Sequence, residues 1–589
     1  MENKNEKSEL EMQRHSLAHI MALAVMQIYP QAKFAIGPDI DNGFYYDIDF
    51  FDQKIGDSDL VEIEKKMKHI VKQNLKFTRS EMNIDEAISK FEKSDDVYKV
   101  DILKELKSEG EEIVSFYQLG DFIDLCRGPH IESSGKIQLG SFKLDKLAGA
   151  YWRGDEKNKM LTRIYGLSFS TKEELDNYVK MVEEAKKRDH RKLGQELDLF
   201  CFSDLVGPGL PLFTPKGMII IDELRHHIES VCRSYGFQKV MTPHLAKIDL
   251  YELSGHAKKF SDELFHVSSA KGHQMVMKPV QCPHQTQIYA SRTRSYRDLP
   301  IRYMESEKQY RAEKTGEVGG LSRVYAITVE DGHTFCTIDQ VKDEIKRMVS
   351  IIKEFYCALG LWDNHWVSLS VRDYANPDKY IGDSEDWDVC EAMLQEVSDE
   401  MDLKAKRQEG EAALYGPKLD FMFRDSIGKE IQIPTVQVDF ATPKRFNLSY
   451  TDKDGQDKPP VMVHRAILGS YERFLALLIE HFAGAFPVWL SPVQVKILSV
   501  GEKHIDHCQK TREEFMKRGI RVELDINNET MGNKIRKATI EKVPYVLVIG
   551  DKEMEENIFA VRKRGGNDTE IFSSDDFFEM ISKEIKERK

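Results

Sequence analysis

The stretch Ser306-Glu307-Lys308-Gln309-Tyr310-Arg311-Ala312-Glu313 is followed by the glycine-rich segment 315–320 and by the apolar run 321–328. This order predicts a strand, a flexible loop and a returning strand. Because side chains alternate along a strand, we expect Arg311 and Glu313 on one face of a sheet. An arginine there can grip a phosphate bidentately, and a glutamate can accept a hydrogen bond from an amino group of a base. Taken alone, the stretch also fits a hairpin with a surface salt bridge.

Two further segments favour the phosphate-binding interpretation. Residues 235–243, with the sequence YGFQKVMTP, predict the end of a helix, a glycine stop and a strand closed by Pro243. Residues 464–473, with the sequence HRAILGSYER, predict the start of an apolar helix on which Arg473 follows Gly469 by four residues. An arginine on the buried face of such a helix needs an anionic partner.

Length and hydropathy describe a large multidomain protein. The 589 residues exceed what one hydrophobic core can organise, so three or four domains are expected. The long apolar stretch 474–490 is interrupted by Glu480 and His481, which argues against a membrane-spanning helix. Residues 1–14 lack the apolar segment of a secretory signal, so we expect a cytoplasmic protein with no membrane partner.

Net charge and cysteine content exclude few classes of function. A net charge of −14 argues mildly against nucleic-acid binding, because phosphate contacts require Lys and Arg, although an acidic protein can carry local basic faces. The eight cysteines lack the spacing of a disulfide framework or a zinc finger. Most of them are expected to be small buried side chains.

The pattern of apolar residues predicts a multidomain fold of α+β and α/β type. A helix followed by the strand-like run 43–49 indicates an α+β domain over residues 1–170. Residues 171–195 carry a threonine cap and sustained charge, as expected for an exposed linker helix. The largest unit follows at 196–490. The segment 491–589 alternates strand and helix, which predicts an α/β domain with a largely parallel sheet.

The N-terminal domain carries a second group of reactive side chains. His15 and His19 are four residues apart on a predicted helix, so both imidazoles lie on one face. The segment 124–130, DLCRGPH, adds Cys126 and His130. These side chains could activate a water molecule for hydrolysis, or they could hold a zinc ion. We prefer water activation by the histidines with Cys126 assisting.

Taken in order, the segments at 235–243, 306–313 and 464–473 resemble the three signature motifs of class II aminoacyl-tRNA synthetases. Pro243 matches the proline of motif 1, which shapes a dimer interface in that family. Arg311 and Glu313 match motif 2 and Arg473 matches motif 3, and both motifs hold ATP. The resemblance implies a catalytic core with an antiparallel sheet, ATP bound with Mg²⁺, and a homodimer.

Five further segments resemble the threonyl-tRNA synthetase family, and the similarity runs from about residue 12 to the C-terminus. They are KPVQCP at 278–283, EDGHTFC at 330–336, YGPKLDF at 415–421, TVQVDF at 435–440 and HRAILGS at 464–470. The resemblance implies a catalytic zinc on Cys282, His333 and His464, with open positions for substrate. Ligands 51 and 131 residues apart give no local spacing signal, so this site rests on the resemblance.

The resemblance also assigns contacts with L-threonine. Zinc is expected to take the amino group and the hydroxyl, with Asp331 accepting from that hydroxyl. A site that demands a hydroxyl rejects valine, because valine would leave polar groups unpaired. Further substrate or catalytic roles fall on Tyr415, Lys418, Gln437, Ser470 and His256, the last in transfer to the tRNA ribose.

Two segments depart from the family pattern. The family usually has Cys-Pro-Gly-His where this chain has Cys282-Pro283-His284-Gln285, and a Gln where this chain has Val329. The expected zinc ligands are retained, whereas a substrate contact near Val329 differs from that of the family.

Serine has the amino and hydroxyl groups of threonine and lacks one methyl, a difference worth only about 1–3 kcal/mol. A second, hydrolytic site is therefore expected. His15, His19, Cys126 and His130 resemble the editing site of bacterial-type threonyl enzymes, which removes serine from mischarged tRNA, and related domains occur in alanyl-tRNA synthetases. The small ubiquitin-like domain that often precedes this domain in the family is expected to be missing here.

The C-terminal segment resembles the anticodon-binding domain shared by threonyl, prolyl, histidyl and glycyl enzymes. Asn528, Lys542, Glu553 and Arg562 match positions that contact anticodon bases, with Lys542 standing where Arg is usual. The implied partner is tRNA(Thr).

Two alternatives remain to be weighed. One is another class IIa synthetase, such as a prolyl enzyme, and the expected zinc ligands and editing residues argue against it. The other is a non-catalytic, synthetase-like RNA-binding regulator, which the intact ATP residues of motifs 2 and 3 disfavour.

Overall fold

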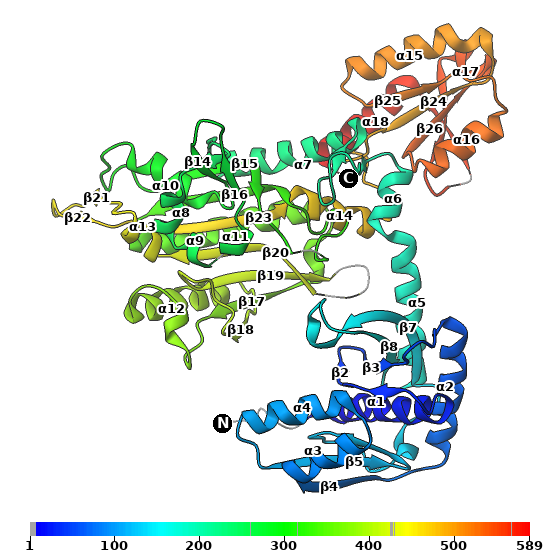
Figure 1. Ribbon diagram of the computed structural model, residues 1–589. Helices are drawn as coiled ribbons and strands as arrows, with labels where there is room; N and C mark the ends of the chain where they lie inside the picture. Colours follow the sequence, from blue (N-terminus) through cyan, green and yellow to red (C-terminus); the bar gives the residue numbers. More distant parts are fainter. Residues whose placement is uncertain are drawn as a thin grey trace. The chain divides into compact units, whose positions relative to one another are not determined.

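The computed structural model describes residues 7–259, 261–314, 316–424, 428, 430–566 and 568–588. Residue 315 of the expected glycine-rich loop and residues 1–6 of the expected N-terminal domain lie outside the described residues. The chain divides into two compact units, Met1–Glu183 and Glu184–Lys589 (Figure 1). Within the described ranges, none of the helices combines the length and apolar character that crossing a bilayer requires.

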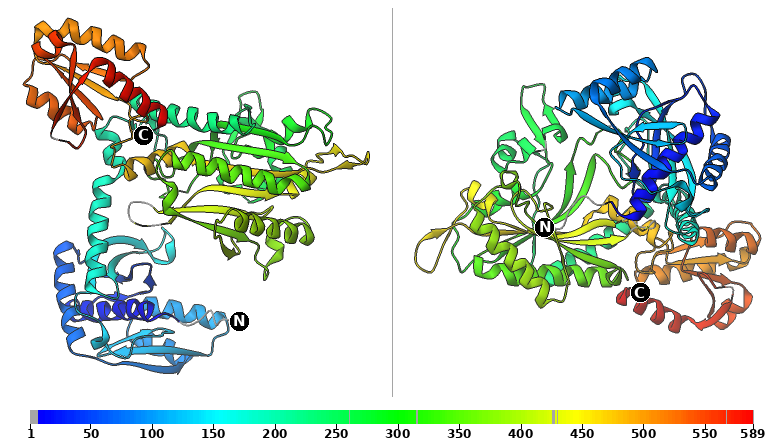
Figure 2. Two further views of the ribbon diagram at one scale, coloured as in Figure 1. Left: turned by 180° about the vertical axis from the view of Figure 1, so that it is seen from behind. Right: turned by 90° about the horizontal axis from the view of Figure 1, so that it is seen from below.

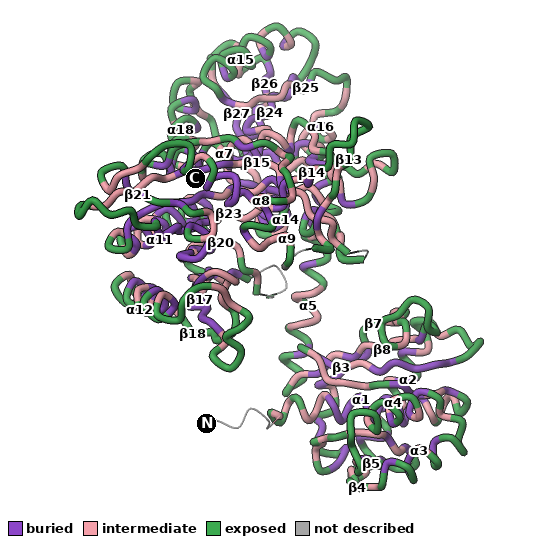
Figure 3. Tube along the Cα trace, turned by 60° about the vertical axis from the view of Figure 1, so that its left-hand side comes forward, coloured by how far each residue is buried: buried purple, intermediate pink, exposed green. Residues whose placement is uncertain are grey.

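The N-terminal unit packs a buried helix against a five-stranded sheet. Helix α1 (Glu9–Ile28) begins with a capping box between Ser8 and Glu11, and its residues 17–25 are buried (Figure 3). The strand order is β1-β3-β8-β7, with β2 beside β3. The elements are α2 (Asp57–Lys72), β1 (Lys33–Phe34), β2 (Asp39–Ile40), β3 (Gly43–Asp49), β7 (Phe142–Tyr151) and β8 (Met160–Ser168).

A smaller antiparallel sheet, β4-β5-β6, completes this unit. Two helices cover it through a separate apolar cluster that includes Phe91, Leu103 and Phe116. The elements are β4 (Phe77–Asn83), α3 (Ile84–Lys93), α4 (Val97–Ser108), β5 (Ile113–Leu119) and β6 (Phe122–Leu125). The predicted α+β character of this part is confirmed.

The expected linker contains two helices, α5 (Lys172–Arg188) and α6 (His190–Glu196). Thr171 and Glu174 form the predicted capping box, because each side chain accepts from the other's backbone N–H. The helix is interrupted at Asp189, whose carboxylate accepts from the N–H of Arg191 and caps α6. Most side chains of α5 are exposed or half-buried (Figure 3).

The larger unit is built on an eight-stranded sheet with the order β11-β15-β16-β23-β20-β19-β17-β18. The inner pairs are antiparallel, and only the outermost pairs, β11 with β15 and β17 with β18, are parallel. Helices α7, α11 and α14 pack on this sheet (Figures 1 and 2). The antiparallel catalytic core implied by the resemblance is confirmed.

The sheet strands are β11 (Gln238–Lys239), β15 (Ile301–Tyr310), β16 (Ala326–Cys336), β17 (His365–Val371), β18 (Lys406–Glu409), β19 (Lys418–Arg424), β20 (Glu430–Asp439) and β23 (Val461–Ser470). The helices are α7 (Pro215–Ser234), α8 (Ile248–Ser254), α9 (His256–Lys259), α10 (Cys282–Ala290), α11 (Val341–Cys357), α12 (Ser384–Glu400), α13 (Ala441–Arg445) and α14 (Tyr471–His481). Short strands are β9 (Phe200–Cys201), β10 (Leu212–Phe213), β12 (Leu245–Ala246), β13 (His266–Ser268), β14 (Gln274–Met277), β21 (Tyr450–Thr451) and β22 (Asp457–Lys458).

The prediction of a helix that starts at His464 is wrong. Residues 464–470 belong to β23, a central strand that pairs with β16 on one side and β20 on the other. Strands buried between two neighbours read as continuous apolar runs, which periodicity alone cannot distinguish from a buried helix. Helix α14 begins only at Tyr471, where Ser470 accepts from the N–H of Arg473.

The prediction that Arg311 and Glu313 lie on one face of a sheet is also wrong. Strand β15 ends at Tyr310, and β16 begins only at Ala326, so both residues lie in the intervening loop. The alternation of side chains along a strand therefore does not fix their relative direction.

The C-terminal segment forms a five-stranded sheet with the order β25-β24-β26-β27-β28. Only the first three strands are parallel, so the sheet is mixed rather than largely parallel. Helices α15 and α18 pack on one face and α16 on the other (Figure 1). The elements are β24 (Val495–Ser499), α15 (Ile505–Lys517), β25 (Val522–Asp525), α16 (Met531–Ile540), β26 (Tyr545–Ile549), α17 (Asp551–Glu556), β27 (Ile558–Lys563), β28 (Thr569–Ser573) and α18 (Ser574–Glu587).

The aromatic core of this C-terminal sheet gives a stability prediction. Phe515 is fully buried and its ring contacts Phe559, Phe577 and Phe578. Phe515→Ala should cost ~3–5 kcal/mol of folding free energy, because it removes buried area and leaves a cavity. The loss of folding free energy is measured by urea unfolding, with hydrogen exchange of peptides from residues 494–584 as the readout. The neighbouring Met516→Ala is the control, since Met516 is 55% exposed; equal effects of the two changes would contradict the prediction.

Candidate active site and metal centre

Neighbouring strands place His333 and His464 opposite each other. Strands β16 and β23 pair with His333 beside His464, and β20 places Gln437 on the other side of His464. Helix α10 begins at Cys282 and brings its thiol to the same point. One donor atom from each of Cys282, His333 and His464 lies within 4.8 Å of the others, and all three residues are buried.

The two imidazoles are oriented as those of metal ligands usually are. His333 Nδ1 lies 2.8 Å from Gln285 Oε1, which can only accept, so Nδ1 carries the proton and Nε2 keeps its lone pair. Within the described part of the chain, that buried Nε2 has no hydrogen-bond partner. His464 Nε2 lies 2.9 Å from an Asp439 carboxylate oxygen, which leaves Nδ1 for a ligand. A thiol and two such imidazoles form a donor set that fits zinc.

Four of the residues predicted to have substrate or catalytic roles lie around this cluster. The Tyr415 ring stacks on His464 with 4.8 Å between ring centroids, and its hydroxyl donates to Gln437 Oε1 at 2.5 Å. Asp331 Oδ2 lies 3.9 Å from His333 Nε2. Lys418 pairs with Gln437 across β19 and β20, and its ammonium donates to Asp420 at 2.6 Å.

A bulge in β16 directs two adjacent acidic side chains to different partners. The register shifts between Val329 and Asp331. Glu330 binds the guanidinium of the fully buried Arg465 at 2.7 and 2.9 Å, whereas Asp331 approaches His333. Burial raises the pKa of Asp331 to about 7. A strongly perturbed carboxyl of this kind is typical of a functional site.

The predicted ATP residues lie at the loop after β15 and at the start of α14. Arg311 donates from its backbone N–H to the Tyr325 carbonyl at 2.9 Å. Glu313 lies 3.6 Å from the guanidinium of Arg323. Arg473 is exposed rather than on a buried face, and Arg323 is close enough to interact with it electrostatically. Sequence reasoning missed Arg323, which has no motif of its own.

His190 of the linker ties these two segments together. Its Nδ1 lies 2.7 Å from a Glu480 carboxylate oxygen on α14, and its Nε2 accepts from the N–H of Leu321 at 3.1 Å. The loop after Arg311 and the helix that carries Arg473 are therefore both held by α6.

Two other predicted residues lie outside the Cys/His cluster. His256 is the first residue of α9, with its Nδ1 2.9 Å from Ser254 Oγ. Ser470 lies opposite Val329 and caps α14. The departure at His284 is accommodated locally, since its Nε2 lies 2.8 Å from the Tyr251 hydroxyl.

The four predicted editing residues do form one cluster. Cys126 Sγ lies 3.3 Å from His15 Nε2 and 3.3 Å from His130 Nε2. The His19 ring lies 4.3 Å from that of His130, between centroids. Ser16 Oγ donates to the Met12 carbonyl, so His130 Nδ1 donates to Ser16 at 3.0 Å and keeps the lone pair of Nε2 towards the thiol.

Burial keeps these groups uncharged. Desolvation lowers the pKa of His15, His19 and His130, and it raises the pKa of the Cys126 thiol to about 12. The imidazoles are thus neutral bases at pH 7, and the thiol can donate a hydrogen bond. A pocket of about 550 Å³ opens at this cluster.

Sequence reasoning missed a buried network beside the editing cluster. The Asp124 carboxylate accepts from Tyr46 and pairs with the buried ammonium of Lys99, and His19 lies 3.4 Å from the same carboxylate. Lys99 also donates to the Ala35 carbonyl at 2.8 Å. Asp124 is the first residue of the segment 124–130 that contains Cys126 and His130, whereas Lys99 on α4 lies in no recognisable motif.

The four predicted anticodon residues are not brought into one cluster. Asn528 follows β25, and Glu553 lies in α17 after β26, so both are at the carboxyl edge of the parallel strands. Lys542 precedes β26 at the opposite edge, and Arg562 pairs with Val546 near that amino end.

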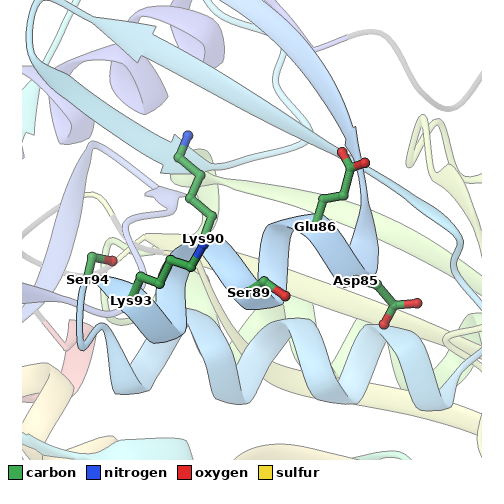
Figure 4. A pocket seen from close by; sticks show the side chains of 6 residues that line it. All are labelled: Asp85, Glu86, Ser89, Lys90, Lys93 and Ser94. Atoms are coloured by element: carbon green, nitrogen blue, oxygen red, sulfur yellow. The ribbon is translucent and has the colours of Figure 1, made fainter.

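A shallow pocket on α3 is separate from the predicted sites. Figure 4 shows its lining side chains along the helix, and all six are exposed. They are Asp85, Glu86, Ser89, Lys90, Lys93 and Ser94.

Three family models match the chain. Residues 265–482 match the tRNA synthetase class II core domain (G, H, P, S and T), and residues 494–584 match an anticodon binding domain. Residues 114–165 match the threonyl and alanyl tRNA synthetase second additional domain. These matches cover the Cys/His cluster, the mixed C-terminal sheet and part of the N-terminal cluster.

Related proteins agree with these matches. A threonine–tRNA ligase of Geobacillus sp. (strain WCH70) is 46% identical over 98% of this chain and 89% of its own length. The threonine–tRNA ligase of Cytophaga hutchinsonii is 45% identical over 97% of this chain and 88% of its own length. A crystal structure of the RNA binding domain of threonyl-tRNA synthetase from Cryptosporidium parvum Iowa II covers 67% of this chain and 98% of its own, with 33% identity and a TM-score of 0.64. The chain therefore belongs to the threonine–tRNA ligase family.

Proposed function

We propose that this protein ligates L-threonine to tRNA(Thr) at the expense of ATP and hydrolyses mischarged seryl-tRNA at a second site. The observation that carries the proposal is the buried Cys282, His333 and His464 cluster, with Asp331 and Tyr415 beside it. Family membership supports the same activity.

Activation of threonine with ATP is assigned to the loop after β15 and the start of α14. Arg311 and Arg473 supply positive charge for the phosphates of ATP, which would be bound with Mg²⁺, and Glu313 accepts from the adenine amino group. These interactions stabilise charge as the threonine carboxylate attacks the α-phosphorus, the bond to the β-phosphate breaks, and threonyl-adenylate and pyrophosphate are formed. His256 is proposed to act in transfer of the threonyl group to the tRNA ribose, and Lys418 in the activation step.

Zinc would be held by Cys282, His333 and His464. When bound, it supplies a Lewis acid that takes the amino group and hydroxyl of threonine. Asp331 accepts from the hydroxyl, and Tyr415, Gln437 and Ser470 complete the proposed substrate contacts. Valine offers no hydroxyl to Asp331, so it leaves polar groups unpaired.

Hydrolytic editing is assigned to His15, His19, Cys126 and His130. Their neutral imidazoles can take a proton from water, and the protonated thiol can donate to the substrate or the water. The alternative is a zinc ion held by the same four side chains, whose donor atoms lie within 4.8 Å of one another.

The remaining assignments complete the proposal. The domains are editing at 1–170, linker at 171–195, catalysis at 196–490 and anticodon binding at 491–589, with Asn528, Lys542, Glu553 and Arg562 as anticodon contacts. We further propose a homodimer, formed through the segment at Pro243, and a cytoplasmic location. The competing function, a non-catalytic RNA-binding regulator, predicts no threonine-dependent exchange between ATP and pyrophosphate, so that assay tests the proposal directly.

The metal assignment is tested by metal analysis. Cys282→Ser should lose about one equivalent of zinc relative to the parent protein, because it removes one of three ligands. Cys201→Ser is the matched control, since Cys201 is exposed and outside the cluster. Full zinc retention by Cys282→Ser would contradict the assignment.

The ATP site is tested by threonine activation. Arg311→Ala and Arg473→Ala should each lower the rate about 10²–10³-fold, because each removes a charge-assisted contact with phosphate. Arg292→Ala, at an exposed position, should activate threonine at the parent rate. Normal activation by both site variants would place the ATP site elsewhere.

The editing assignment is tested with His15→Ala combined with His19→Ala. Threonine activation should stay near the parent rate, because no proposed ATP or zinc ligand is changed, whereas seryl-tRNA should accumulate. The synthetic site distinguishes serine by only one methyl, worth about 1–3 kcal/mol, so hydrolysis must remove the error.

A chelator separates the two editing models in the parent protein. Deacylation that resists chelation supports water activation by the histidines, whereas a metal-dependent loss supports zinc. If the double variant deacylates seryl-tRNA as fast as the parent, the cluster is not the editing site.

A further inference from the structure

A buried chain of hydrogen bonds leads to the Cys/His cluster from the segment before Pro243. It begins at Thr242, passes through Glu305 of β15 and Gln285 of α10, and ends at His333. All four of these side chains are buried, and the Glu305 residue is only 1% exposed. Buried polar groups are costly unless each is paired, so such a chain has a fixed arrangement of donors and acceptors.

Glu305 is held as an acceptor at the centre of this chain. Thr242 donates to Glu305 Oε1 from both its N–H, at 2.6 Å, and its hydroxyl, at 2.8 Å. The buried ammonium of Lys278 lies 3.6 Å from the same oxygen and donates to the Thr242 hydroxyl at 3.1 Å. Both hydrogen bonds from Thr242 therefore end on this one oxygen of Glu305. Its second oxygen, Oε2, is left facing Gln285.

This carboxylate decides which way the Gln285 amide points. Since a carboxylate can only accept, the amide nitrogen of Gln285 must face Glu305, and it does so at 3.1 Å. The amide oxygen must then face His333, where Nδ1 lies 2.8 Å away. His333 Nδ1 therefore carries the proton, and Nε2 keeps its lone pair, for which no hydrogen-bond partner is present among the described residues.

We infer that Gln285 is a positioning residue of the metal centre: held by Glu305, it selects the His333 tautomer whose Nε2 can bind the metal. The inference rests on the proposed function, in which Cys282, His333 and His464 hold zinc. Helix α10 makes the arrangement compact, because Cys282 and Gln285 are three residues apart and lie on the same side of the helix.

A histidine at this position could perform the same role. An imidazole can also donate with one nitrogen to Glu305 and accept with the other from His333. A leucine has a similar volume to Gln and can do neither. The role therefore predicts opposite outcomes for Gln285→His and Gln285→Leu.

The test measures zinc affinity by competition with a chelator, together with the visible absorption of the cobalt-substituted protein. Gln285→Leu should weaken zinc binding about 10–100-fold, as expected when the partner of a ligating imidazole is lost, and should alter the cobalt spectrum. Gln285→His should bind zinc within a few-fold of the parent. Gln287→Leu is the matched control, because Gln287 is exposed on the same helix.

The outcomes separate this inference from the proposed function. If the parent binds zinc and Gln285→Leu keeps both its affinity and its cobalt spectrum, Gln285 has no positioning role while the metal site stands. If the parent binds no zinc, or if Cys282→Ser retains all of it, the proposed metal site itself fails. Circular dichroism and thermal melting check folding; should Gln285→Leu not fold, weak zinc binding by a folded Gln285→His protein overturns the inference, and near-parent binding supports it.

Discussion

The pairing of β16 with β23 determines where the two histidines of the Cys/His cluster lie. Their register sets His333 beside His464, and the next pairing, β23 with β20, adds Gln437. Because side chains alternate along a strand, the same register places Arg465 and Gly332 on the opposite face. A slip of one residue between these two strands would put the two imidazoles on opposite faces of the sheet. The chemistry thus depends on backbone hydrogen bonds between segments far apart in the sequence.

Buried ion pairs and hydrogen bonds tie these strands to each other and to helix α14. Arg465, fully buried, is neutralised by Glu330. Glu472 accepts from the N–H and hydroxyl of Thr328 and pairs with Lys308, so it links α14 to β15 and β16. Such ion pairs contribute little net stability, because desolvation of the charges offsets their attraction. Removing one partner is costly, however, so they specify a single packing of these strands.

How far the sequence predicts the site depends on the distance between its residues along the chain. His15 and His19 lie four residues apart, and helix geometry alone puts them on one face, as α1 has them. No local rule relates Cys282, His333 and His464, so only the family resemblance could bring them together. Partners such as Lys99 and Arg323 act through contacts made in three dimensions, and no pattern near them in the sequence marks them.

Two of the wrong predictions have physical causes that a single sequence does not reveal. Residues 464–470 are buried or half-buried on both faces because they form a central strand, and such a run carries no period that separates strand from helix. The prediction that Arg311 and Glu313 share a face required the strand to continue through both residues, whereas β15 ends one residue before Arg311. Ends of elements are set by packing and capping, which a single sequence encodes weakly.

The two units have separate hydrophobic cores, and this has a consequence for evolution. The main core of the first unit lies within residues 17–164, and that of the second begins at Leu193. The division falls within the mostly exposed helix α5, where a crossover between genes would cut through neither core. Recombination at this helix can therefore transfer or delete the N-terminal unit as a module. Selection can then act on proofreading separately from the ligase, in the same polypeptide or in two.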